Sequence, residues 1–559
     1  MSSLFSRITL AMLAMLVLVA SQRQAAAQTD MEMQPGIIIS MAPLNKHLGD
    51  VEHLVEAAGF GQMKGLVRMG SAEYIRGINA DKPMGAMLFF EGDNPEPEVL
   101  GFLPVEDIDD VLDTIAQFVD IDDSGDDIFL TTDDGTELTV RVQDGYAFIA
   151  QDDSVLDVLP ADPANLLEEL PNEYNLAARI FGQRIPEELR STMVDLIRQG
   201  AAESTIPGAD GPMAKLQQRN LEISMKQIES LINNTDEVVA GLNVDQENKR
   251  IYIDVKFVGT PDSLLAQQAA AMATAPATRF AGFLLDDAAF NFHYTGKMLE
   301  QDVSQVQGLL NDAKQTMTAE MEKGVKNGAM SEDQAESAGR IVGDLIDVVS
   351  ESIKGGVMDV AAVVTFDDNS PALAAGMKMA GGDKLEDAAR QLAKIAEAEK
   401  APVEFRFDTV TEDGIRYHEV DILIPENEEE ARKILGDRVS LLLGVGDDVL
   451  YLAAGKSGKE LLEKCKRGSA KGEKLPAMQA NMHLLPFLRF LAEAQDAAEL
   501  NMIADALPDE ADDRMRMTVK FIDNGQLIRM EMEDGILEVF GKVGQSMGGG
   551  FAPPQDFRP

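Results

Sequence analysis

Apolar and polar residues alternate on both sides of a tight turn at two places in the chain, the pattern of a β-hairpin. Near the C-terminus the alternation runs through 515–521 and 528–532 around the turn Asp523-Asn524-Gly525. An earlier hairpin runs through 238–244 and returns through 251–257. Successive side chains of a strand point to opposite faces, so we expect each hairpin to bury its apolar face in a core and expose its polar face to water.

Two stretches of the chain also repeat one order of elements. A strand predicted at Met84–Phe90 matches one at Val360–Phe366, and Phe90-Glu-Gly-Asp-Asn-Pro95 matches Phe366-Asp-Asp-Asn-Ser-Pro371. Each stretch then leads through a second strand into an amphipathic helix. The apolar positions of the two helices have the same spacing: Ile108, Val111, Leu112, Ile115 and Phe118, and Leu385, Ala388, Ala389, Leu392 and Ile395.

Downstream, we match the turn at Asp133-Asp134-Gly135 with the turn at Glu412-Asp413-Gly414, with extra residues in the second stretch around 426–436. The sequence therefore predicts an α+β fold of two related halves, each an antiparallel sheet backed by amphipathic helices. We place the halves at 36–273 and 277–545.

Three further segments complete this prediction. The Ala-rich stretch 269–277 joins the halves, and the second half carries an extra helical hairpin at 299–326 and 331–354. Ser331 and Gln334 have the spacing of a capping box at the start of its second helix. The tail after Gly541, with 546–559 at its end, has no periodicity, and we expect it to be disordered.

The N-terminus has the pattern of a signal peptide. Arg7 precedes an uncharged apolar run, Ile8–Ala20, which is too short to span a bilayer, and Ala25-Ala26-Ala27 offers a cleavage site. We expect residues 1–27 to be removed and the mature chain to begin near Gln28. It contains no further apolar stretch of spanning length, so we expect a periplasmic or extracellular protein without an integral membrane segment.

Charge and cysteine content narrow the classes of function. The formal charge is -47, and loss of Arg7 and Arg23 with the leader makes it -49. Such a polyanion repels nucleic acid and acidic lipid headgroups. The only cysteine, Cys465, cannot form an internal disulfide, so stability must come from packing.

Two loops carry partial ligand motifs. Gly455-Lys456-Ser457 resembles the end of a phosphate-binding loop, but the glycine required five residues earlier is Leu450, so we interpret Ser457, and Ser154 in the first half, as helix N-caps. The second loop resembles the first half of a calcium loop, but its twelfth position is Thr131 instead of glutamate. The candidate metal ligands of this second loop are Asp120, Asp122, Ser124 and Asp126.

Other residues that could bind metals have simpler interpretations. No two of the five histidines are four residues apart, so we interpret His47, His53, His293, His418 and His483 as surface or boundary residues and expect no zinc site. Met-x-Met pairs could bind Cu(I), but we interpret them as core packing. The pairs are Met377 with Met379, Met515 with Met517, and Met530 with Met532.

The sequence shows no nucleophile with an identifiable base, and no catalytic residue or cofactor is predicted. With its leader, its matched halves and its acidic composition, the chain resembles the large exported proteins of unknown function found in planctomycete-type bacteria. That resemblance implies an extracytoplasmic location and no established activity. We therefore expect a non-catalytic periplasmic or envelope binding or structural protein, whose partner is a protein or another envelope component. The alternative is a hydrolase with an unrecognised carboxylate site.

Overall fold

The computed structural model describes residues 34–546 except positions 93, 161, 204–211, 368–369, 470–474, 495–499, 502 and 505–511. The predicted leader, 1–27, lies outside the described residues. The chain divides into two compact units: unit 1 contains Met1–Gln199, Glu229–Ser263 and Arg529–Pro559, and unit 2 contains Gly200–Ile228 and Leu264–Ile528. Compared with the expected halves, this division places Arg529–Pro559 in unit 1 and Gly200–Ile228 in unit 2.

Unit 1 is built on an antiparallel sheet with the strand order β10-β9-β8-β1-β2-β3-β7-β6-β5-β4. The last five residues of β20 also lie in unit 1, where β20 pairs with β10. The strands are β1 Ile37–Met41, β2 Met84–Phe89, β3 Glu98–Pro104, β4 Val119–Asp122, β5 Ile128–Thr132, β6 Glu137–Gln143, β7 Tyr146–Ala150, β8 Leu176–Phe181, β9 Thr235–Asp245 and β10 Arg250–Gly259.

Helices cover parts of this sheet. Residues of η2, η3 and α5 pack with Phe102 and Phe148 in the main core, and α4 packs against β4–β7 in a second cluster on the other side of β7. The helical segments are α2 Leu44–Ala57, η1 Gly61–Met63, α3 Lys64–Ser71, α4 Ile108–Ile115, η2 Asp153–Val158, η3 Pro163–Leu167, α5 Leu170–Glu173, η4 Gly182–Arg184, α6 Glu187–Glu203, α7 Pro212–Asn234 and α16 Asp534–Ser546, of which α6 and α7 cross unit boundaries.

Unit 2 contains a second antiparallel sheet arrangement, with the strand order β19-β18-β11-β12-β13-β17-β16-β15-β14. Its main core lies between β12, β13, β15 and β17, η5 and α13. The strands are β11 Phe290–Lys297, β12 Val357–Asp367, β13 Ser370–Lys378, β14 Val403–Glu412, β15 Ile415–Leu423, β16 Arg438–Val445, β17 Val449–Ala454, β18 Met478–His483, β19 Arg514–Ile522 and β20 Gly525–Glu533.

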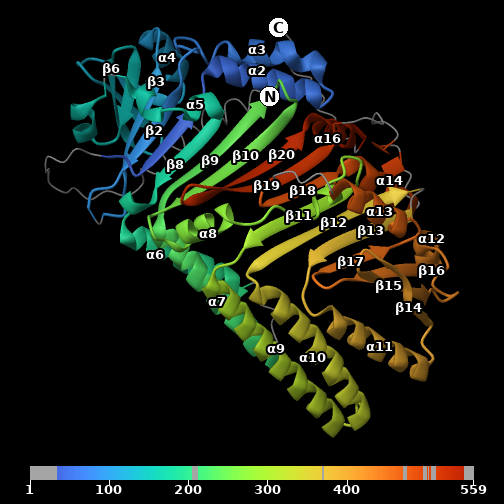
Figure 1. Ribbon diagram of the computed structural model, residues 1–559. Coiled ribbons are helices and arrows are strands. Elements are labelled where there is room, and N and C mark those ends of the chain that lie inside the picture. Colours follow the sequence, from blue (N-terminus) through green and yellow to red (C-terminus); the bar gives the residue numbers. More distant parts are fainter. Residues whose placement is uncertain are drawn as a thin grey trace. The chain divides into compact units, whose positions relative to one another are not determined.

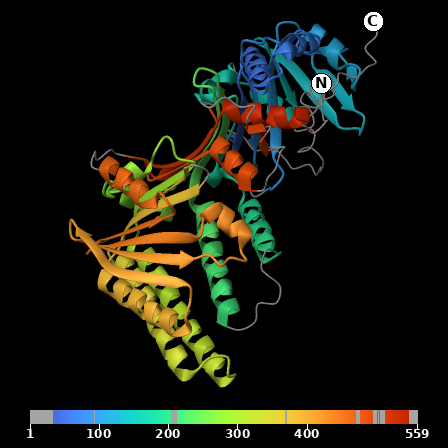
Figure 2. The same ribbon diagram turned by 90° about the vertical axis from the view of Figure 1, so that its right-hand side faces the viewer.

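The helical hairpin predicted for this half is confirmed. It consists of α9 Glu300–Lys326 and α10 Glu332–Lys354, which lie side by side in Figures 1 and 2, and both hydrogen bonds of the Ser331–Gln334 capping box are present. The other helical segments are α8 Leu264–Ala273, η5 Ala281–Phe283, α11 Gly382–Glu399, α12 Glu429–Leu435, α13 Gly458–Gly468 and α14 Leu484–Ala494.

The predicted α+β class is confirmed, since antiparallel strands and helices make up both units. Both hairpins form as expected: β9 pairs with β10, and β19 pairs with β20 across a turn in which Asn524 has a φ of 57°. Two local predictions need correction. The Ala-rich linker begins inside α8, and α16 continues to Ser546, five residues beyond the predicted end of order at Gly541. Residues 547–559 lie outside the described part of the chain.

Candidate functional site

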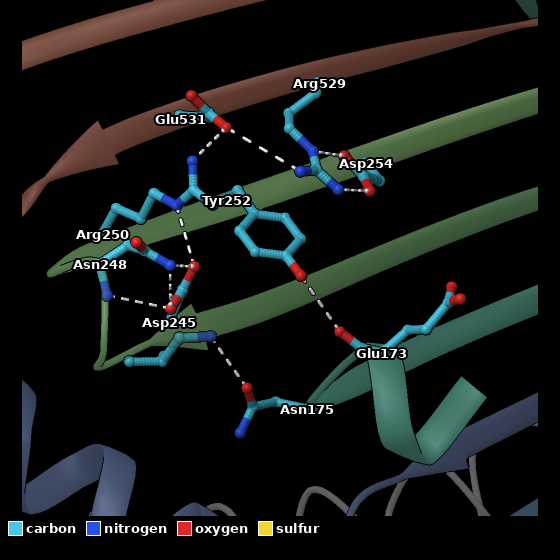
Figure 3. A network of polar contacts seen from close by, with 10 residues as sticks. Glu173, Asn175, Asp245, Asn248, Arg250, Tyr252, Asp254, Arg529 and Glu531 are labelled. Atoms are coloured by element: carbon cyan, nitrogen blue, oxygen red, sulfur yellow. Dashed lines mark hydrogen bonds and ion pairs between the residues drawn. The ribbon is translucent and has the colours of Figure 1, made fainter. Parts of the chain in front are cut away.

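A network of ionisable side chains in unit 1 lies on one face of β10 and β20 (Figure 3). Asp254, almost completely buried, accepts hydrogen bonds from Nε (2.7 Å) and Nη2 (2.6 Å) of Arg529 and from the Tyr174 hydroxyl (3.0 Å). Burial raises the pKa of the Tyr174 hydroxyl above its usual value. The hydrogen bond to Asp254 raises the pKa of Arg529.

The same network continues along β10 towards the turn. Arg250 joins Asp245 of β9 (3.0 Å) to Glu531 of β20 (2.9 Å), and the Arg529 guanidinium lies 4.2 Å from the centre of the Tyr252 ring. Each of these carboxylates therefore already has a cationic partner. A general acid or base needs a group that is free to exchange a proton with a substrate, so this network stabilises the sheet and is a poor catalytic centre.

A second polar cluster in unit 1 connects α2 to β9. Asp50 accepts hydrogen bonds from Asn175 (2.5 Å) and Gln246 (2.5 Å), while Lys46 donates to Asn175 (3.3 Å) and Asn243 (2.8 Å). Burial lowers the pKa of Lys46. These contacts satisfy buried polar groups and again leave no obvious reactive one.

In unit 2, one group of three potential metal-binding side chains comes together: Glu386, Asp408 and His418. It is the only such group of His, Cys, Asp and Glu side chains in the described part of the chain. The register of β14 and β15 shifts between Arg406 and Val410, and Asp408 there has a φ of 55°. This irregularity directs the Asp408 backbone N–H to Nδ1 of buried His418, at 3.1 Å.

The hydrogen bonds of this group do not suit a metal ion. Nδ1 of His418 accepts a backbone hydrogen, so the neutral ring carries its proton on Nε2, which lies 3.3 Å from Glu386. Glu386 accepts a hydrogen bond from Arg416 (2.6 Å), and Asp408 accepts one from Arg390 (2.7 Å). A cation would have to compete with two arginines for ligands and would meet an N–H group at Nε2.

His293 of β11 is the other fully buried histidine. Neither of its ring nitrogens has a hydrogen-bond partner among the described residues, and burial lowers its pKa to about 4. It is therefore neutral at neutral pH. The prediction that all five histidines are surface or boundary residues is wrong for His293 and His418, since the sequence pattern around a histidine does not report what packs above it.

The candidate calcium ligands lie around the hairpin of β4 and β5. Asp120 and Asp122 lie in β4, and Asp122 accepts hydrogen bonds from the backbone N–H (3.1 Å) and hydroxyl (2.6 Å) of Ser124. The hydroxyl hydrogen bond lowers the pKa of Asp122. Asp120 pairs in register with Thr131, and Asp126 is exposed. The interpretation of this segment as an acidic loop without a calcium site stays a prediction.

The two predicted serine caps differ in outcome. Ser457 occupies the N-cap position of α13, although its side chain makes no capping hydrogen bond. Ser154 is not the cap of η2: Asp152 is, and its carboxylate accepts a hydrogen bond from the Ser154 backbone N–H (2.9 Å). A carboxylate two residues earlier along the chain reaches the free N–H groups at the start of a helical turn.

An apolar surface lies on the opposite side of the unit 1 sheet from the network in Figure 3. Its side chains form three cross-strand rows on β8, β9 and β10, and none of them is buried. We call this surface the open face of unit 1. The rows are Leu176, Leu242 and Ile253; Ala178, Ala240 and Val255; and Ile180, Val238 and Phe257.

The first row is the most exposed. Leu176, Leu242 and Ile253 are 42%, 37% and 40% exposed, while Asp254, the neighbour of Ile253 on β10, is buried. Met530 of β20 alternates with Arg529 and Glu531, so it points to the same side as Ile253, and it is 45% exposed. The expectation for the first hairpin is therefore wrong for most of this face: among its predicted apolar residues only Val244 is buried, and the covered face holds Val239 together with Asp254.

The corresponding face of the unit 2 sheet is also apolar, but α14 covers part of it, because Phe366 of β12 stacks on Phe490 with ring centres 4.4 Å apart. The three rows of this face contain no buried side chain: Met482, Phe290, Val364 and Leu373; Ala480, Phe292, Ala362 and Ala375; and Met478, Tyr294, Val360 and Met377. On the other face of the same strands, Asn291, His293 and Asp359 are buried. This face of unit 2 is thus apolar, while the other face includes buried polar groups.

The methionine pairs need a corresponding correction. The first methionine of each pair is exposed: Met377, Met515 (40%) and Met530. Core packing therefore does not account for these three residues. Met379 is buried. The sequence shows that apolar and polar residues alternate along these strands. This alternation indicates that the two faces of the sheet differ, but it does not indicate which face is covered.

Among the described residues, every helix is too short or too polar to cross a membrane. Cys465 is a buried free thiol. Comparison with known proteins adds no relative: no protein-family model, no curated protein and no solved structure matches the chain.

Proposed function

We propose that this chain is an exported, non-catalytic binding protein that holds its ligand on the open face of unit 1. The observation that carries the proposal is the exposed apolar row Leu176, Leu242 and Ile253, which lies back to back with a covered face rich in ion pairs. In antiparallel sheets with one covered face, the apolar side usually packs on the core and the polar side meets water. Here the covered face also contains the apolar core, with Ala177 and Val239 buried in it, yet apolar side chains remain in water on the other face as well, a typical mark of a binding site.

The state of the carboxylates favours binding over hydrolysis. Asp254, Glu386 and Asp408 each accept a hydrogen bond from an arginine. A hydrolase with two catalytic carboxylates needs one of them protonated as an acid, whereas a neighbouring guanidinium favours the ionised form. The ion pairs therefore fit a structural role, which a binding protein needs on the covered face of its sheet.

We further propose that the two units arose from one repeated module. Adding ten to each strand number of β9-β8-β1-β2-β3-β7-β6-β5-β4 gives β19-β18-β11-β12-β13-β17-β16-β15-β14, the pairing order in unit 2. This agreement supports the matches made at Met84–Phe90 with Val360–Phe366. It also changes one match: β14 and β15 correspond to β4 and β5, so the counterpart of the 412–414 turn is 123–127 and not 133–135.

Export is proposed from the leader, which lies outside the described residues. Mass spectrometry of the protein from its native cell should find an N-terminus close to Gln28. Recovery of the intact leader in the membrane pellet would contradict export as a soluble protein.

Binding on the open face of unit 1 is testable with an uncharged fluorescent probe, N-phenylnaphthylamine, which brightens in apolar surroundings. The variant Leu176→Ser/Leu242→Ser/Ile253→Ser removes the most exposed row without creating a buried polar group. A matched control, Met193→Ser/Leu196→Ser/Ile197→Ser, removes three exposed apolar side chains of α6. We expect weaker probe binding in the first variant and wild-type binding in the control. Equal binding by all three proteins would refute the proposed site.

A further inference from the structure

The chemistry of the open face of unit 1 restricts what can lie on it. All backbone N–H and C=O groups in the middle of a sheet are engaged with neighbouring strands, so a sheet face offers only side chains. On the open face of unit 1 those side chains are Leu, Ile, Val, Ala and Phe, without a hydrogen-bonding atom. An extended peptide lying there would bury unpaired amides, which is costly, whereas a hydrocarbon chain has no polar group to satisfy.

The side-chain lengths in the three rows of the open face of unit 1 favour a narrow ligand. In unit 1 the middle row, Ala178, Ala240 and Val255, has shorter side chains than the rows on either side, which end in Leu, Ile and Phe. The corresponding row of unit 2 is interrupted by Phe292, which lies between Ala480 and Ala362, so the continuous row of short side chains is that of unit 1. A single alkyl chain can follow one such row across the strands, since neighbouring strands are about 4.8 Å apart.

The charge of the protein restricts the other end of the ligand. With a formal charge of -47 on 559 residues, the surface repels a carboxylate or a phosphate monoester at short range. A zwitterionic or cationic headgroup meets no such repulsion. Resting on the proposed function, we infer that the open face of unit 1 binds the hydrocarbon chain of amphiphiles with zwitterionic or cationic headgroups, one chain lying across β8, β9 and β10.

The inference is tested by calorimetric titration of the full mature chain with dodecylphosphocholine and dodecyl phosphate, both below micelle formation. The two amphiphiles share one alkyl chain and differ in headgroup charge. We expect the phosphocholine to bind at least about tenfold more tightly at low salt, and the difference to shrink as salt screens the repulsion. The variant Leu176→Ser/Leu242→Ser/Ile253→Ser should lose most of this binding, because it removes the apolar row beside the proposed alkyl chain.

Different failures have different meanings. If N-phenylnaphthylamine binds the open face of unit 1 but dodecylphosphocholine does not, the hydrocarbon inference is wrong and the proposed function stands. Equal affinity for both amphiphiles at low salt would overturn the headgroup preference. If sedimentation shows that the wild-type protein is a dimer and the triple variant a monomer, a second copy covers this face and the inference is wrong. The α6 control variant must behave as wild type in each measurement, and far-UV circular dichroism checks that all variants fold.

Discussion

The ion pair between Asp254 and Arg529 provides the sharpest test of how unit 1 is held together. The Asp254 side chain is 2% exposed and the Arg529 side chain is 30% exposed, and two hydrogen bonds join them across β10 and β20. Removing either partner leaves the other charge without its main counter-charge. The two removals differ in cost because water reaches the arginine more easily than the aspartate.

The change Arg529→Met removes the two guanidinium hydrogen bonds to the buried Asp254 carboxylate and leaves the one from the Tyr174 hydroxyl. It should lower the free energy of unfolding by about 3 to 5 kcal/mol. The change Asp254→Asn keeps an oxygen acceptor and leaves a partly hydrated guanidinium, so we expect a smaller loss of about 1 to 3 kcal/mol. Replacing both residues, as Asp254→Leu/Arg529→Met, removes both charges together. This variant should lie within about 1 to 2 kcal/mol of the wild type.

Urea unfolding followed by far-UV circular dichroism measures these free energies, with the transition of unit 1 analysed separately if the two units unfold in sequence. Arg198→Met is the matched control, because Arg198 pairs with Asp195 on the surface of α6 and both are well exposed. Its cost should stay below about 1 kcal/mol. If Arg529→Met costs no more than this control, the burial of Asp254 does not have the consequence assigned to it.

Three further outcomes follow from single sites. The free energy of unfolding should fall by up to about 3 kcal/mol as the pH drops from about 6.5 to about 4, because His293 binds a proton in the unfolded chain but, with its pKa lowered to about 4, stays neutral in the folded one. The urea midpoint should depend less steeply on pH in His293→Leu. The melting temperature should rise with sodium chloride, since salt screens the repulsion within a chain of charge -47. At matched ionic strength, calcium should raise the melting temperature no more than sodium does, and Asp122→Ala should not change this result. Cys465 should react with iodoacetamide only after unfolding, because burial raises the pKa of its thiol to about 12; rapid labelling of the native protein would show that α13 opens.

Several local elements could be predicted from sequence because their causes are local. The Ser331–Gln334 capping box fixes the start of α10, and the turn at Asn524 fixes the register of the C-terminal hairpin. The stripe from Leu385 to Ile395 lies in one helix, α11. In each case, the residues that decide the structure are only a few positions apart.

The candidate site depended on information that no local pattern contains. Alternation along β9 and β10 separates Leu242 and Ile253 from Asn243 and Asp254, but both sets could have faced the core. The partner of Asp254 lies 275 positions later in the chain, at Arg529, and the group around His418 joins α11, β14 and β15. Sequence by itself determined the elements and the fact that each sheet has two unlike faces. Only tertiary structure decided which face is covered, because that depends on which distant side chains pair across the strands and which helices pack on them.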